Sequence, residues 1–116
     1  MINLPPSVQI YVCTEAADMR RSFDGLSAMV KYIIKKDPLS GHLFVFRNKK
    51  RDRVKLLFWD RTGFVIWYKR LEKGRFRFPD KAAAGENHIE LEAGHLTLLL
   101  EGIDLRRARR HHKKFF

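Results

Sequence analysis

The stretch HLFVFRNKKRDRVKLLFWD, residues 42–60, consists of two apolar runs on either side of a cluster of positive charge. Apolar runs rich in β-branched and aromatic residues, bounded by polar turn residues, are typical of β-strands. We therefore predict strands over His42–Phe46 and Val54–Trp59, joined as a hairpin by the segment NKKRD. Five of the seven residues from Arg47 to Arg53 are Lys or Arg, which places this charge at the hairpin tip.

Strand signals continue on both sides of this hairpin. Phe64–Lys69 follows the turn DRTG (60–63) and predicts the third strand of an antiparallel meander. The alternating segment Arg75–Phe78, between a glycine and a proline, predicts a fourth short strand. Val8–Val12 and His88–Leu91 also have strand-like composition, so we expect a sheet of about four to five strands.

Apolar residues at helical spacing predict two amphipathic helices. The first stripe consists of Phe23, Leu26, Met29, Val30, Ile33 and Ile34. Pro38 would end this helix, because a proline disfavours helical backbone in the residue before it. The second stripe consists of Leu96, Leu99, Leu100 and Ile103. Gly102 is placed where a glycine commonly follows a helix end, with Ile103 able to fold back on Leu98.

These elements predict one α+β domain over residues 1–104, an antiparallel β-meander packed with two amphipathic helices, followed by a flexible basic tail over residues 105–116. Both faces of the middle strand carry apolar bulk, with Leu56 on one face and Leu57 on the other. One helix covers only one face of a sheet. The second face must therefore meet the other helix, a partner or a nucleic acid.

Positive charge is concentrated in two regions of the chain. The 116 residues carry a formal net charge of +11. The segment 47–77 contains 12 Lys or Arg and three acids, a net charge of +9, and the segment 105–116 adds six Lys or Arg and no acid. The remainder is slightly acidic. A surplus of this size points to a polyanionic partner: nucleic acid, an anionic membrane surface or an acidic protein.

The basic side chains of these two regions are the candidate nucleic-acid-binding residues. They are Arg47, Lys49, Lys50, Arg51, Arg53, Lys55, Lys69, Arg70, Lys73, Arg75, Arg77, Arg106, Arg107, Arg109 and Arg110. The alternative for the hairpin tip is an ordinary solvated surface. Six aromatic residues are interleaved with the basic ones: Trp59, Phe64, Trp67, Tyr68, Phe76 and Phe78. These rings would either stack on the bases of a single strand or fill the core.

The sequence contains few of the features that an enzyme active site requires. The acids are dispersed, and no glycine-rich phosphate loop is present. His111 and His112 are adjacent, with no Cys or acid at metal-ligand spacing, and Cys13 is the single cysteine. We therefore expect no enzymatic activity, no cofactor and no metal. With no signal peptide and no apolar run of the ~20 residues that span a bilayer, we expect a cytoplasmic protein that does not bind membranes.

Four segments of the chain resemble one known family. They are DMRRSFDGL (18–26), DPLSGHLFVFRNKKRDRVKLLFWDRTGF (37–64), WYKRLEKGRFRFP (67–79) and LLLEGIDL (98–105). Together they closely resemble the TnpB-type accessory proteins, encoded by the second reading frame, of the IS66 family of bacterial insertion sequences. The resemblance covers roughly residues 8–105, which is nearly the whole chain.

This resemblance implies an accessory role in DNA transposition, in which a separate, larger DDE-type transposase transfers the strands. Together with the basic charge and the two-sided apolar sheet, it leads us to expect DNA, in particular the element ends, and the transposase as partners, with self-association and a nucleoid-associated location as further expectations. No catalytic residues carry over. The alternative is a protein-interaction subunit that docks the transposase or a second copy, with its charge complementing an acidic partner. A stand-alone nuclease is a third hypothesis, for which the chain is short.

Overall fold

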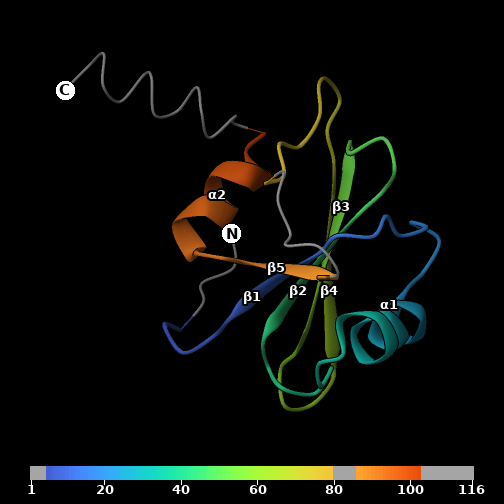
Figure 1. The fold of residues 1–116 in the computed structure, drawn as a ribbon, viewed down its shortest axis with the longest axis vertical. Helices are drawn as coiled ribbons and strands as arrows, with labels where there is room; N and C mark the ends of the chain where they lie inside the picture. The colour runs from blue at the N-terminus through green and yellow to red at the C-terminus, as the bar shows by residue number, and fades with distance from the viewer. Residues whose placement is uncertain (1–4, 80–85, 103–116) are drawn as a thin grey trace.

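The computed structural model describes residues 5–79 and 86–102 of the chain. Within these residues the chain forms five strands and two helices, and a π-helical segment extends the first helix (Figure 1). In chain order the elements are β1 (Ile10–Cys13), α1 (Phe23–Met29), the π-helical segment η1 (Val30–Ile34), β2 (Leu43–Arg47), β3 (Arg53–Trp59), β4 (Phe64–Arg70), β5 (His88–Leu91) and α2 (Ala93–Leu100).

The described strands form a mixed sheet in the order β4-β3-β2-β1-β5. The meander β2–β3–β4 is antiparallel as predicted, with Leu57 paired to Phe44 on one side and to Ile66 on the other. β1 lies parallel to β2, with Ile10 opposite Leu43, so the prediction of a purely antiparallel sheet was wrong. The connection explains the difference, because a helical crossover such as α1 returns the chain to the end at which β1 began.

α1 and η1 cover one face of the sheet (Figure 1). The buried helical side chains on this face are Leu26, Met29, Val30 and Ile34. They pack on the strand residues Tyr11, Cys13, Phe44, Phe46 and Leu57. Most of the predicted apolar stripe therefore faces the core, whereas Phe23, its first residue, is 45% exposed. The π-helical segment ends where Lys35 adopts a left-handed conformation, with φ of 60°, three residues before Pro38.

α2 and the extended segment 75–78 cover the opposite face. Buried side chains from the sheet on this side are Ile10, Val12, Leu43, Val45, Val54 and Leu56. Leu96, Leu99 and Leu100 of α2 pack on them together with Phe76 and Phe78. The second apolar face that the sequence left open thus meets the second helix and this segment.

Residues 75–78 do not form the predicted fourth strand. Within the described residues this segment is tied to the hairpin tip by a single backbone hydrogen bond, from Phe76 N to Arg51 O at 2.7 Å, and not by a ladder. The predicted alternation is nevertheless present. Phe76 and Phe78 point into the core, whereas Arg75 and Arg77 are exposed. Side-chain burial therefore holds this segment in place.

The described part of the chain ends at Gly102, two residues after α2. Gly102 has φ of 78°, which confirms the glycine predicted after this helix. The predicted contact of Ile103, the tail over residues 105–116 and the boundary at residue 104 lie outside the described residues. In the described parts of the chain, no helix is long and apolar enough to cross a membrane.

Candidate nucleic-acid interface

The tip of the β2–β3 hairpin is built around the side chain of Asn48. Its Oδ1 accepts hydrogen bonds from the backbone N–H groups of Asp52 and Arg53, each at 3.1 Å, and its Nδ2 donates to Asp52 Oδ1 at 2.6 Å. The backbone N–H of Arg51 donates to Asn48 O at 3.2 Å, and Arg51 has φ of 62°. Asn48 and the backbone thus shape the turn, and the side chains of Lys49 and Lys50 are exposed.

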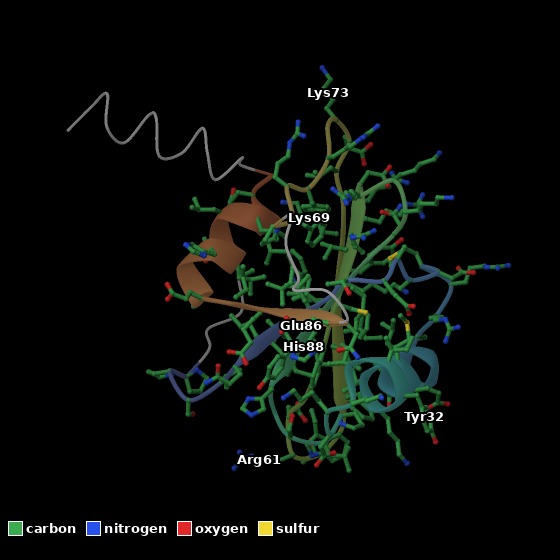
Figure 2. The ribbon with its side chains drawn as sticks, viewed as in Figure 1. Tyr32, Arg61, Lys69, Lys73, Glu86 and His88 are labelled. Carbon is green, nitrogen blue, oxygen red and sulfur yellow. The ribbon has the colours of Figure 1, made fainter. Side chains whose placement is uncertain are left out.

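The segment after β4 runs beside this tip. Leu71 N donates to Asp52 O at 2.8 Å, and Phe76 N donates to Arg51 O at 2.7 Å. Both loops reach the upper end of the ribbon in Figure 1, and Lys73 marks that end in Figure 2. The two halves of the basic region, separate in the sequence, are therefore neighbours in space.

Besides Arg70, which pairs with Glu72, six of the predicted binding residues are exposed at this end of the sheet. We call them the basic end: Lys49, Lys50, Arg51, Lys73, Arg75 and Arg77. Gly102, the last described residue, and Glu101 line the same hollow as Lys73, Arg75 and Arg77. The tail candidates Arg106, Arg107, Arg109 and Arg110 lie outside the described residues.

Three other predicted binding residues use their charged groups inside the protein. Lys55 is only 8% exposed, and its Nζ donates to Met19 O at 2.7 Å and to Arg21 O at 2.8 Å. Lys69 Nζ donates to Leu100 O at 2.7 Å, at the negative end of the α2 dipole. Both lysines therefore satisfy backbone carbonyls, and neither presents its ammonium group to a ligand.

Arg47 is the third of these residues. Its guanidinium donates to Thr14 O at 2.9 Å, and burial lowers its pKa from the ordinary value. Two further candidates also have partners on the protein. Arg53 donates to the Tyr68 hydroxyl at 3.2 Å, and Arg70 pairs with Glu72 at 3.0 Å. Both of these groups stay near the surface, where a stronger anion can compete for them.

Most aromatic rings in the basic region belong to the fold. Phe76 is 1% exposed and Phe78 is 9% exposed. Of the two predicted roles, stacking on bases or filling the core, both rings therefore fill the core. Trp59 packs against Phe64 in an edge-to-face pair next to the turn that contains Arg61, at the opposite end of the sheet (Figure 2). Tyr68 is 46% exposed, but the Lys55 ammonium lies 4.7 Å from its ring centroid.

Sequence reasoning missed Arg20 and Arg21, which lie in the loop between β1 and α1. Arg20 lines an open hollow of about 440 Å³ together with Lys49, Lys50 and Arg53. Arg21 is exposed, and its carbonyl oxygen is held by Lys55. The available signal was the pair of adjacent arginines in DMRRSFDGL, but about thirty residues separate it from the hairpin tip in the sequence.

Asp18 orients the guanidinium of Arg20. Arg20 Nη2 lies 2.6 Å from Asp18 Oδ2, and Nε lies 3.0 Å from the same oxygen. Hydrogen bonds from the Arg20 side chain and backbone lower the pKa of Asp18 to about 2. The acid therefore stays ionised down to that pH.

We expect the Asp18 carboxyl to titrate near pH 2 when followed by carboxyl-carbon NMR, and its midpoint to rise toward the ordinary ~3.9 in an Arg20→Gln variant. Because folding lowers this pKa, the pair stabilises the fold above pH 4 and that contribution is lost as pH falls toward 2. A wild-type midpoint near 4 would contradict the bidentate pairing.

Two further acids near the basic end have partners on the protein, whereas Glu101 is exposed and lines the hollow formed by Lys73, Arg75 and Arg77. Asn48 donates to Asp52 and lowers its pKa, and Glu72 pairs with Arg70. The six cations of the basic end outnumber the acids beside them. In the described parts of the chain, no three His, Cys, Asp or Glu side chains are grouped as metal ligands would be.

Comparison with known proteins agrees with the resemblance seen in the sequence motifs. A family model described as "IS66 Orf2 like protein" matches residues 8–110. Two uncharacterized proteins of Sinorhizobium fredii are similar over nearly their whole length. One, y4jC, is 37% identical over 95% of this chain and 92% of its own, and the other, y4hO, is 36% identical over 91% and 90%. No solved structure matches the chain significantly.

Proposed function

This chain belongs to the IS66 Orf2-like family, and from that premise we propose that it is a non-catalytic accessory protein of DNA transposition that binds DNA through the basic end. Family membership supports the transposition-related role. The DNA-binding activity, the transposase as a partner and the absence of catalysis are our inferences.

The observation that carries this proposal is the union of the hairpin tip with the segment after β4. Two backbone hydrogen bonds hold six exposed cations at one end of the sheet. Like charges gathered this way repel one another unless a polyanion neutralises them. A β-ribbon tip of this kind can follow the phosphates of DNA or enter a groove.

We expect the protein to bind a 30-base-pair duplex carrying the end of its element with an affinity that falls steeply as salt rises. Each neutralised phosphate contributes about 0.9 to the slope of log affinity against log salt, so contacts from the whole basic end predict a slope of about −5. Fluorescence anisotropy over a salt series measures this slope. A scrambled duplex tests sequence preference, and no binding at 50 mM salt would contradict the proposal.

A protein-interaction role is the second candidate, and the position of β4 favours it. β4 is at one edge of the described sheet, and its residues Val65, Ile66 and Trp67 are only partly buried. Such an edge strand can pair with a strand of another molecule. Sedimentation of nuclease-treated protein at high salt, with and without the transposase, tests this role. A monomer that does not bind transposase would contradict it.

A further inference from the structure

We propose that the ligand of the basic end is a nucleic-acid duplex held by its phosphates, and that the Asp18–Arg21 loop forms a further part of the contact surface. This inference rests on the proposed function and specifies its ligand. Three separate parts of the chain then hold the duplex: the hairpin tip, the segment 73–77 and this loop.

The burial of the aromatic rings near the basic end favours a duplex over a single strand as the ligand. Proteins that bind single strands without sequence preference combine a basic groove with exposed aromatic rings on which bases stack. Phe76 and Phe78, which alternate with the exposed Arg75 and Arg77, are buried in the core. Tyr68 already lies against Lys55, and its hydroxyl accepts from Arg53. Among the described residues, the basic end therefore offers cations for phosphates but few surfaces for bases.

The Asp18–Arg21 loop is fastened to the sheet by a buried charge. The Lys55 ammonium, on β3, donates to two carbonyl oxygens of this loop, those of Met19 and Arg21. A hydrogen bond from Ala17 N to Arg47 O at 2.8 Å ties the start of the loop to β2. The loop is thus held against the strands that carry the hairpin tip.

Asp18 leaves Arg20 able to bind a second anion. A guanidinium has five N–H donors, and Asp18 engages those on Nε and Nη2. Arg20 lines the same hollow as Lys49 and Lys50, and the carboxylates of Asp18 and Asp52, which also line it, are each hydrogen-bonded to a neighbouring side chain. Because the backbone of the tip and the Arg20 guanidinium are held in place before binding, less freedom is lost when this surface meets the regularly spaced phosphates of a duplex.

The test is a double variant, Arg20→Gln with Arg21→Gln, compared with Lys31→Gln plus Lys36→Gln. The control removes the same charge from η1 and the residues after it, at the opposite end of β2 from the tip. We expect the first variant to bind a 30-base-pair duplex about tenfold more weakly at 150 mM salt, with a salt slope smaller by about 1.8. The control should lose less than about threefold, through long-range charge alone.

The same measurements on a single strand with equal phosphate number separate the possible outcomes. We expect weaker binding of the single strand by the wild type. Equal or tighter binding of the single strand would overturn the duplex assignment while leaving the proposed DNA binding intact. Equal losses in the two double variants would overturn the role of the loop. Failure of the wild type to bind either nucleic acid would refute the proposed function itself.

Discussion

Replacing Lys49, Lys50 and Arg51 together with glutamine is expected to weaken duplex binding about a hundredfold at 150 mM salt. The slope of log affinity against log salt should fall by about 2.7, because three phosphate contacts are lost. The fold should survive, since Asn48 and backbone hydrogen bonds shape the turn. Anisotropy titration and a thermal melt measure both quantities.

The matched control removes three charges elsewhere: Lys31→Gln, Lys36→Gln and Arg61→Gln. Arg61 suits this purpose because, like Arg51, it has a positive φ, 84°, in a turn between strands, and it lies at the opposite end of the sheet from Lys73 (Figure 2). An unchanged slope in the tip variant, or an equal loss in the control, would show that net charge rather than the tip governs binding.

Phe76→Ala is expected to lower the free energy of unfolding by about 3–5 kcal/mol, the usual range for a buried phenylalanine in a packed core. Its side chain is 1% exposed and packs with Phe78, with 6.3 Å between the ring centroids, among residues of the sheet and α2. The same change should weaken DNA binding, because burial of this ring holds Arg75 and Arg77 beside the hairpin tip. Urea unfolding and anisotropy measure the two effects.

Phe23→Ala provides the comparison for this variant. Phe23 begins α1 and is 45% exposed, so its removal should cost less than about 1 kcal/mol. If Phe76 instead stacked on bases, Phe76→Ala would reduce affinity for single strands and leave the unfolding curve in place. That result would contradict the core assignment.

The elements that form were readable from local sequence, although the strand predicted over Arg75–Phe78 did not form. Strand composition predicted β5 with the bounds found, His88–Leu91, and placed the strands of the meander to within a residue or two. Helical spacing predicted the stripe that α1 and η1 bury, and Gly102 marked the end of α2. These predictions succeed because periodicity and turn chemistry act within a few residues of one another.

The binding surface was only partly readable. The charge pattern located the hairpin tip and the segment 73–77, and the structure places them side by side. It also grouped Lys55 and Lys69 with them, although both ammonium groups bind backbone carbonyls. It left out Arg20, which shares a hollow with Lys49 and Lys50. The sequence does not distinguish a lysine whose ammonium group is in water from one whose ammonium group donates to the carbonyl of a distant loop.

The sequence by itself predicted the five strands and two helices that form, together with a strand over 75–78 that does not, and it showed that the charge is concentrated near one hairpin. Only the tertiary structure decided that β1 pairs parallel with β2, that Phe76 and Phe78 close the second face of the sheet, and which cations stay exposed. The physical reason is the separation along the chain of the residues on which each property depends. Propensity and periodicity depend on neighbours along the chain, whereas pairing, burial and the partners of a charge depend on residues that only folding brings together.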